Sequence, residues 1–341
     1  WGLVDALAPL SRFDEEVTKL ETEMMKETSD KSGRQGVALA PITPEVDDDA
    51  IRYRHVTVDL KAAARTAKIS IRVPADAKAP KSADEARAAG ANWWFFRLMR
   101  ELDDALLRLR FNHSEIGLLL LETRGSIEAV LANDAALETL AKDWFVNEVR
   151  HHTKRVLKRL DLTAKSIFAI VDEGSCFAGT LLELALAADR IYALNDPDVE
   201  VQMASSSLNG GAYPMANGLS RLQTRFLRTP DQVKDILDEK KAFDIERAEE
   251  LGLTTSAPDD IDWEDEIRVA CEERASFSPD ALTGMEANLR FAGPETMETK
   301  IFGRLSAWQN WIFQRPNAVG ARGALSCYGE PTQPEFDYQR T

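Results

Sequence analysis

The sequence predicts an α/β protein with a mostly parallel β-sheet. Three short, mostly apolar runs at residues 116–121, 167–171 and 190–194 are too short for helices and are typical of buried strands. Residues 135–159 and 179–188 lie between these runs and have the apolar spacing of helices. Strand, helix, strand, helix, strand is the order of βαβ units, whose crossover connections produce a parallel sheet.

The chain before this pattern adds two strands and one helix to the prediction. Residues 53–60 and 67–73 alternate with period 2 and are rich in Val, Ile and Thr, so we expect a strand pair at the start of the sheet. Residues 92–109 place apolar side chains at helical spacing opposite a charged face, which indicates an amphipathic helix. Residues 26–49 contain turn residues without a hydrophobic period, and we interpret them as a linker.

The composition excludes several classes of partner. A chain of 341 residues with 44% hydrophobic residues can bury a core without disulfides. The net charge of −15 argues against nucleic acid or a membrane surface as a partner, because both select clustered Lys and Arg. Three cysteines without a CxxC pair indicate neither a disulfide framework nor a zinc site, and they fit a cytoplasmic compartment. No run approaches the roughly 18 apolar residues of a membrane span.

The last part of the chain, residues 261–341, is predicted to be a helical region for docking or dimerisation. It is rich in charged residues and helix formers, and its final 22 positions, residues 320–341, hold the glycines and prolines of an irregular segment. An apolar cluster at helical spacing fits burial against a partner subunit, which would make the protein a homodimer. The cluster consists of Trp308, Trp311, Ile312 and Phe313.

A sequence repeat connects the start of the chain with this region. Gly2 and Leu3 match Gly252 and Leu253, and residues 13–17 match residues 263–267 at the same offset. One interpretation is a chance similarity of two acidic helix starts. The other is that residues 1–25 are the tail of a preceding domain homologous to the one that follows, because repeats of this kind mark duplicated units.

The stretch KSIFAIVDEGSCFAGTLLELALAADRIYAL, residues 165–194, contains a recognisable motif. An apolar strand leads to Gly174, a short loop ends at Gly179, and Glu183 lies on a helix six residues before Asp189. This arrangement, together with FDIERAEELGL at residues 243–253, resembles the crotonase (enoyl-CoA hydratase/isomerase) superfamily. The resemblance implies a crotonase-like (ClpP/crotonase) ββα spiral over residues 50–260, preceded by the tail of another crotonase-like domain.

The resemblance also implies a site. In this family two backbone N–H groups hold the thioester oxygen while negative charge develops on it, and one of them lies at a helix start where the macrodipole adds stabilisation. The matching positions are the amides of Thr180 and Asn133, with Glu183 as the catalytic carboxylate. Ser207 and Cys176 are further candidates for substrate contacts. No cofactor and no metal is implied, since CoA enters as part of the acyl-CoA substrate.

The motif departs from the family pattern at positions that matter for catalysis. Glycines of the family are replaced in Gly179-Thr180-Leu181 and in residues 131–134, LAND, so side chains stand where a thioester would approach the backbone. The family's second catalytic Glu falls at Ser207, which cannot act as a carboxylate base. Simple hydratase chemistry is therefore not expected.

Two candidate residues each have a structural interpretation as well as a catalytic one. Glu183 is either a buried carboxylate with a raised pKa that transfers protons, or a structural Glu paired with an Arg or a capping group. Cys176 could be a thiolate, but no His is near it in sequence, and packing as a small apolar residue is favoured.

The repeat, the closing YGEPTQPEFDYQR and the divergent motif together resemble the C-terminal half of a double-length family, the benzoyl-CoA-dihydrodiol lyases. That family cleaves the ring of dihydrodiol benzoyl-CoA and releases formate. The resemblance implies an N-terminal crotonase-like half that is catalytic and a second half, this chain, that scaffolds and dimerises. The alternative is an active enoyl-CoA hydratase/isomerase-like enzyme that uses Glu183 with the two amides. A stand-alone interaction module is the third possibility.

Overall fold

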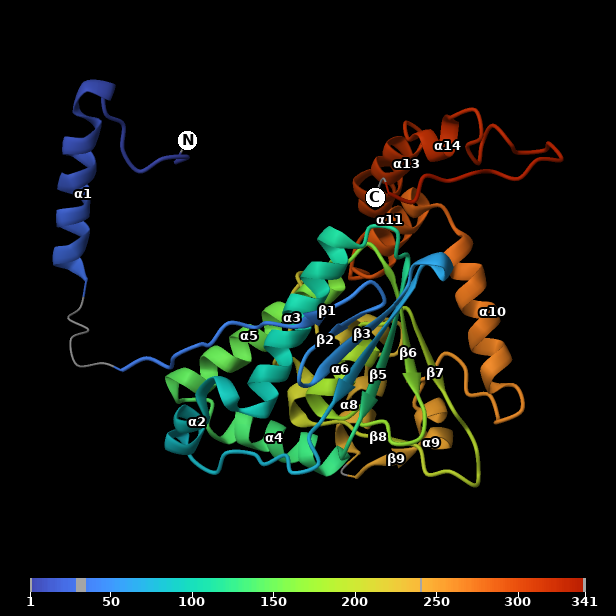
Figure 1. The fold of residues 1–341 in the computed structure, drawn as a ribbon, viewed down its shortest axis with the longest axis horizontal. Helices are drawn as coiled ribbons and strands as arrows, with labels where there is room; N and C mark the ends of the chain where they lie inside the picture. The colour runs from blue at the N-terminus through green and yellow to red at the C-terminus, as the bar shows by residue number, and fades with distance from the viewer. Residues whose placement is uncertain (1, 29–34, 240, 340–341) are drawn as a thin grey trace. The chain divides into compact units, whose positions relative to one another are not determined.

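The computed structural model of the chain describes residues 2–28, 35–239 and 241–339. The chain divides into two units, residues 1–38 and residues 39–341 (Figure 1). The first unit contains a 3-10 turn, Leu10–Arg12, and one helix, α1, Phe13–Glu27. No residue of α1 is buried.

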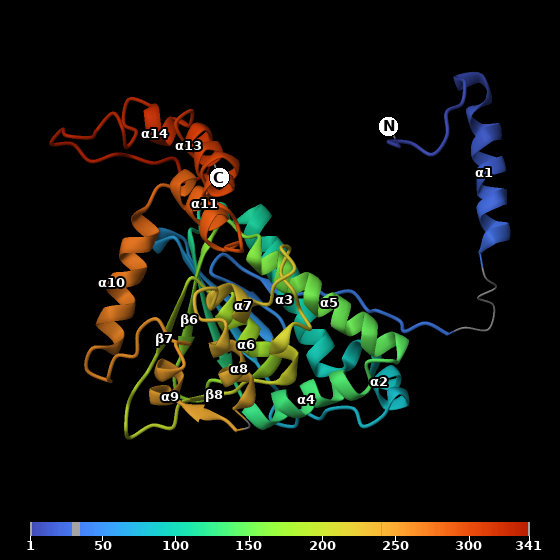
Figure 2. The same ribbon diagram turned by 180° about the vertical axis from the view of Figure 1, so that it is seen from behind.

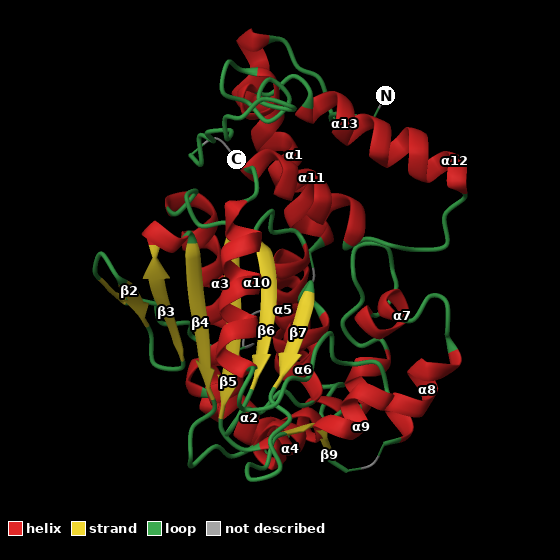
Figure 3. Cartoon of the chain, turned by 90° about the vertical axis from the view of Figure 1, so that its right-hand side faces the viewer, coloured by secondary structure: helices red, strands yellow, loops and turns green. Residues whose placement is uncertain are grey.

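The second unit is built on a single large sheet. In the described part of the chain, seven strands form this sheet in the order in which they occur in the sequence. Strands β1 to β4 pair antiparallel, and β4 to β7 pair parallel (Figure 3). The strands are β1 (Glu45–Val46), β2 (Ala50–Arg52), β3 (Val56–Lys61), β4 (Thr66–Arg72), β5 (Leu118–Arg124), β6 (Ser166–Val171) and β7 (Arg190–Ala193).

Helices cover the face of the sheet that is nearer the viewer in Figure 2. Their starts follow local sequence rules, since Ser82, Ser126 and Asp143 each accept hydrogen bonds from backbone N–H groups of the helix they precede. Asp143 therefore separates two helices within the region where the sequence predicts a single long one. The helices are α2 (Ala83–Ala89), α3 (Trp94–Asn112), α4 (Ile127–Thr139), α5 (Trp144–Asp161) and α6 (Gly179–Leu186).

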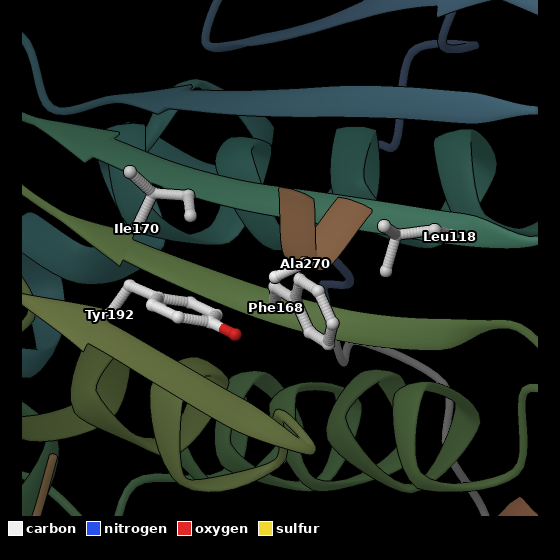
Figure 4. Packing of buried hydrophobic residues seen from close by; sticks show 5 residues of the cluster. All are labelled: Leu118, Phe168, Ile170, Tyr192 and Ala270. Atoms are coloured by element: carbon white, nitrogen blue, oxygen red, sulfur yellow. The ribbon is translucent and has the colours of Figure 1, made fainter. Parts of the chain in front are cut away.

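Helix α10 (Trp263–Ser276) packs on the opposite face of the sheet. Its Ala270 lies against an apolar cluster that includes Leu118 of β5 and Phe168 of β6 (Figure 4). Trp263, Ile267 and Cys271 of the same helix are partly buried against this cluster. Strand β6 is consequently covered on both faces and is buried along its whole length.

Shorter elements complete the unit at both ends of the parallel strands. Strand β8 (Gln202–Met203) pairs antiparallel with β9 (Phe243–Asp244). Among the described residues, no helix is long and apolar enough to cross a membrane. The remaining elements are the 3-10 helices η2 (Ala62–Ala64), η3 (Gly90–Asn92) and η4 (Ser207–Gly210), helices α7 (Arg221–Arg225), α8 (Asp231–Asp238), α9 (Ile245–Glu250), α11 (Pro279–Leu289) and α12 (Met297–Lys300), a π-helical segment (Ile301–Leu305), and helices α13 (Ser306–Ile312) and α14 (Pro316–Val319).

The sequence repeat extends to backbone conformation. Gly2 and Gly252 both have positive φ, +66° and +70°. At the same offset, α1 begins at Phe13 and α10 begins at Trp263, and each has three acidic residues in its first turn. The two repeated segments have different surroundings: Leu253, after Gly252, is fully buried, whereas Leu3, after Gly2, is 81% exposed.

The fold class predicted from the sequence is confirmed. The predicted strands, the crossover helices and the helical C-terminal region are all present. The predicted linker needs correction at one end, because residues 45–46 form strand β1. Residues 29–34 of that linker lie outside the described part of the chain.

Candidate functional site

The predicted site lies at the carboxyl ends of β5 and β6. After β6, residues 172–178 form a loop, and α6 begins at Gly179 with a positive φ of +44°. A Cβ atom at this position would lie 2.0 Å from Oδ2 of Asp134, so no other residue fits. Glycine therefore allows α4 and the start of α6 to approach closely.

The backbone N–H of Thr180 already has a partner inside the protein. It donates to Oδ2 of Asp134 at 2.7 Å, and the Thr180 hydroxyl donates to Oδ1 at 2.6 Å. Ser206 donates a third hydrogen bond to this carboxylate, at 2.7 Å. A carboxylate at a helix N-terminus is favourable because unpaired N–H groups and the macrodipole both attract negative charge. Asp134 thus occupies the place that the sequence assigns to a thioester oxygen.

Asp134 is almost completely buried. The residue is 2% exposed, and burial raises the pKa of its carboxyl group to about 6. The hydrogen bonds from Thr180 and Ser206 act in the opposite direction, because they stabilise the charged form. The carboxylate is therefore held in place by its donors at a cost in desolvation.

Asn133, the second predicted amide donor, is not at a helix start. It is the seventh residue of α4, beyond the first four N–H groups that a helix leaves free, so its amide belongs to the helical hydrogen bonding. Its side-chain Oδ1 accepts from Nε1 of Trp93 at 2.9 Å. The structure therefore does not bring the Thr180 and Asn133 amides together as an open pair of donors, because residues 127–139 are helical where the prediction requires a loop.

Glu183 is 1% exposed and both of its carboxylate oxygens are engaged. Nδ2 of Asn209 donates to Oε1 at 2.7 Å, and Nη1 of Arg221 donates to Oε2 at 2.8 Å. Complete burial raises the pKa of Glu183, and the Arg221 guanidinium opposes that rise. Of the two interpretations of Glu183, pairing with an arginine is the arrangement that the structure contains.

Arg221 joins three segments of the chain. Its Nε and Nη2 donate to the two carboxylate oxygens of Asp161 at 3.0 and 2.6 Å, and its Nη1 also donates to the Tyr213 carbonyl at 3.1 Å. Burial lowers the pKa of Arg221, but the Glu183 and Asp161 carboxylates outweigh this and raise it overall. A fully buried cation between two carboxylates is a structural clamp whose members depend on one another.

The other two predicted contacts lie in different environments. Ser207 is on the surface and donates to Glu138 at 2.7 Å, whereas its neighbour Ser206 faces Asp134. Cys176 is fully buried, and burial raises the pKa of its thiol to about 11, so it is a neutral packing residue at neutral pH.

Sequence reasoning missed the residues that close this site. Asp134 adjoins the predicted Asn133, and Asn209 lies two residues after the predicted Ser207. Arg221 lies 38 residues from Glu183, and no local spacing links the two. In the described part of the chain, no group of three or more His, Cys, Asp or Glu residues is arranged to hold a metal ion.

The chain shares its fold with enoyl-CoA hydratases of known structure. An enoyl-CoA hydratase structure from Geobacillus kaustophilus HTA426 superposes with a TM-score of 0.62 at 14% identity, over 85% of this chain and 98% of that one. An enoyl-CoA hydratase from Bacillus anthracis superposes with a TM-score of 0.60 at 15% identity, over 83% of this chain and 99% of that one. No family model matches the sequence.

The chain also has a relative with much higher sequence identity than these structures. The chain is 45% identical over 342 residues to benzoyl-CoA-dihydrodiol lyase from Aromatoleum evansii. This alignment covers 100% of the chain but 61% of the relative. The chain is therefore a homologue of benzoyl-CoA-dihydrodiol lyase with a crotonase-like fold, which confirms the predicted resemblance.

Proposed function

We propose that the chain is the scaffolding and dimerising half of a cytoplasmic, ring-cleaving acyl-CoA lyase of the benzoyl-CoA-dihydrodiol lyase type, which acts in aromatic degradation. The single observation that carries this proposal is the Asp134 carboxylate at the Thr180 amide. An oxyanion hole works only if its donors are free and aimed at the developing charge. In this chain the helix-start donor is already used.

A thioester could reach that amide only by displacing Asp134. Thr180 and Asp134 are 0% and 2% exposed, so displacement would break three hydrogen bonds and leave a buried carboxylate unpaired. Leaving a buried group without its hydrogen bonds typically costs about 1 to 3 kcal/mol, and more when the group is charged. Such a cost fits a site that does not bind substrate.

Glu183 supports the same conclusion. A general base must lie within hydrogen-bond reach of the proton that it abstracts. Both oxygens of Glu183 are bound by Asn209 and Arg221 at 2.7 and 2.8 Å, and the side chain is 1% exposed. Its role in this proposal is to fix α6 to the rest of the domain.

The acyl-CoA site of the complete enzyme is assigned to an N-terminal crotonase-like half. The chain spans 61% of the length of its relative, which leaves room for such a half. The repeat at residues 2–27 agrees with this arrangement, because its local conformation matches the segment that includes α10.

The dimer contact is assigned to an apolar stripe in the C-terminal region. Trp308 and Ile312 of the predicted docking cluster pack internally, next to Gly284 of α11. One to three turns before Trp308, apolar side chains remain exposed at intervals of three to five residues, which is typical of an interface core. The stripe consists of Met297 (69% exposed), Ile301 (38%), Phe302 (74%) and Leu305 (54%).

Calorimetric titration of the chain with crotonyl-CoA tests the closed site. We expect no binding in the micromolar range. Micromolar binding that is lost in Glu183→Ala but kept in Glu138→Ala, a surface control, would instead establish the hydratase/isomerase-like alternative. Binding that appears only in Asp134→Ala would support the proposal, because that change empties the position at the Thr180 amide.

Sedimentation equilibrium tests the dimer contact. We expect Phe302→Asp to shift a dimer of the chain toward monomer, since a charge would enter an apolar interface. Phe111→Asp is the matched control, because Phe111 is 75% exposed and Phe302 is 74% exposed. Equal dissociation in both variants, or in neither, would contradict the assignment.

A further inference from the structure

The amino ends of the parallel strands contain a second cluster of charged residues. Arg65, Gly117 and Lys165 immediately precede β4, β5 and β6. The first residues of these strands are in register, Thr66 with Leu118 and Leu118 with Ser166. Parallel strands begin at the same edge of a sheet, so the three preceding residues lie side by side, at the opposite edge from Asp134.

Arg65 is held in an unusual backbone conformation, and its guanidinium lies over the Tyr338 ring, 3.6 Å from the ring centroid. Among the described residues it is the only non-glycine with positive φ, +56°, a strain of roughly 1 kcal/mol or more. Its Nε donates to the Glu115 carbonyl, and its Nη1 donates to the carbonyls of Ala275 and Phe277. Nη2 is buried and has no hydrogen-bond partner.

Gly117 allows the Arg65 guanidinium to pack closely against the backbone at the start of β5. A Cβ atom at Gly117 would lie 2.8 Å from Nη2 of Arg65. The residue lines a cavity of about 230 Å³ together with Arg65. Because a water molecule occupies roughly 30 Å³ of liquid, the cavity has room for a small ligand.

Two more cations line the same cavity. Nζ of Lys165 donates to the carbonyls of His113 and Ile116, both at 2.7 Å, which leaves its third N–H unassigned. Arg110, at the end of α3, is half-buried and donates to the Arg159 carbonyl at 3.1 Å. Burial lowers the pKa of Lys165 to about 8; Glu115 acts against this, and the charges of Arg65 and Arg110 add to it.

The charge of this cavity is opposite to that of the protein. The net charge of the chain is −15, yet the described residues that line the cavity include three cations and no carboxylate. Hydroxyl groups of Ser114, Thr163 and Thr283 complete the polar lining. Buried cations without a carboxylate in direct contact are costly, and an anion from outside would reduce that cost.

We propose that this cavity binds a phosphate group, either inorganic phosphate or the phosphate of a small phosphomonoester. Arg65 contributes its charge, Lys165 its third N–H, and Arg110 a half-buried guanidinium. Arginine and lysine bind phosphate through charge-assisted hydrogen bonds, and guanidinium groups match the geometry of phosphate oxygens. The inference goes beyond the scaffolding role and does not depend on it, since the two sites lie at opposite edges of the sheet.

Calorimetric titration of the full chain at constant ionic strength, with inorganic phosphate and separately with O-phosphoserine, tests the proposal. We expect at least one of the two to bind at millimolar or lower concentration. Arg110→Gln should weaken binding by roughly tenfold or more, because one charge-assisted contact is lost. Arg155→Gln is the control: it removes the same charge from an exposed position on α5 and should leave affinity unchanged.

Gly117→Ala provides a second variant that retains every charge. Its methyl group would displace the Arg65 guanidinium, so we expect binding to be lost while thermal unfolding confirms a folded chain. Preference for inorganic phosphate or for O-phosphoserine would identify the source of the phosphate group. Absence of binding for both probes, or equal affinities in the wild type, Arg110→Gln and Gly117→Ala, would overturn the proposal.

Discussion

Two clusters of buried charge at opposite edges of the parallel sheet differ in how they are paired. At the carboxyl ends of β5 and β6, the Thr180 amide, the Asp134 carboxylate and the Glu183 carboxylate are all paired with groups of the protein itself. At the amino ends, Arg65 keeps a buried nitrogen without a partner, and Lys165 is charged in a cavity without a lining carboxylate. The groups at the edge that resembles a catalytic site are paired within the protein, whereas the cations of the cavity at the other edge have no lining carboxylate. We call the first the closed edge and the second the open edge.

This difference shows why a motif and its function can separate. The strand, the glycine turn and the helix of residues 165–194 all persist, and they still present an amide at a helix start. One carboxylate from a neighbouring helix is enough to occupy that amide. The fold therefore survives without the chemistry, because the same hydrogen bond that stabilises a bound thioester can stabilise the domain.

Arg221→Ala should have the largest effect on this comparison. The substitution leaves the buried carboxylates of Glu183 and Asp161 without their cation, which typically costs about 3 to 5 kcal/mol of unfolding free energy. Urea unfolding measures the loss. Arg268→Ala is the control, since the ion pairs of Arg268 are exposed and such pairs contribute little. Similar small losses in both variants would mean that the carboxylates are not clamped.

Lys165→Met tests the open edge through its pH dependence. The pKa of Lys165 is lowered from 10.5 to about 8, so the folded state binds this proton less tightly than the unfolded chain. The wild type should therefore gain up to about 3 kcal/mol as pH rises from 8 to 10.5, and lose it as pH falls through 8. Arg65, Arg110, Glu115 and His113 surround the amine and remain in the variant.

The measurement for Lys165→Met is the difference in unfolding free energy between variant and wild type across this pH range. The loss of the hydrogen bonds to the His113 and Ile116 carbonyls lowers the stability of the variant at every pH. The slope above pH 8 is the diagnostic quantity. If the two proteins keep a constant difference, the ammonium is not desolvated and the contrast between the edges weakens.

Asp134→Asn tests the closed edge, and its pH dependence has the opposite sign. The pKa of Asp134 is raised from 3.8 to about 6, so the folded state binds this proton more tightly than the unfolded chain. The associated stability is present below about pH 4 and is lost as pH rises through 6. Asparagine does not titrate, so the variant should gain about 3 kcal/mol on the wild type between pH 4 and 7.

Thermal or urea unfolding at several pH values measures this gain. An amide can keep the essential contacts of Asp134, with its oxygen accepting from the Thr180 amide and from Ser206 and its nitrogen donating to the Thr180 hydroxyl. A variant whose stability falls in parallel with the wild type above pH 5 would show that Asp134 is not the group that titrates.

The fold could be predicted because its signals are local. Residues 116–121 and 167–171 are continuous apolar runs, and residues 92–109 have a clear helical period. Strand β1 was missed because its two residues carry no period and their side chains are exposed. The break between α4 and α5 depends on the cap at Asp143, which a single long apolar pattern conceals.

The closure of the site could not be predicted because it is non-local. Whether Glu183 is a base or a paired carboxylate depends on Arg221 and Asp161, which come from other helices. The sequence analysis assigned no role to Asp134, although it adjoins the predicted Asn133. Apolar residues are distributed all around α4, so the sequence does not show which face of this helix contacts α6. Spacing in sequence identifies the motif, whereas tertiary contacts decide what its groups bind.

The smallest prediction compares two adjacent serines at the closed edge. Ser206 donates to Asp134 and also accepts from the Leu208 amide as the cap of η4, whereas Ser207, the position predicted from the sequence, lies on the surface and bonds Glu138. Ser206→Ala should lower the unfolding free energy by about 1 to 2 kcal/mol, because a capping hydrogen bond and a donor to a buried carboxylate are lost together.

Ser207→Ala is the matched control and should stay within about 0.5 kcal/mol of the wild type. Loss of the Ser206 donor should also raise the pKa of Asp134 further, since one group that stabilises its charged form is gone. The fall in unfolding free energy with rising pH would then extend to higher pH in Ser206→Ala but not in Ser207→Ala. If the two variants have the same unfolding free energy and the same pH dependence, the Ser206 hydroxyl does not stabilise the Asp134 carboxylate. The contacts with Thr180 would then be the only ones that hold Asp134 in place.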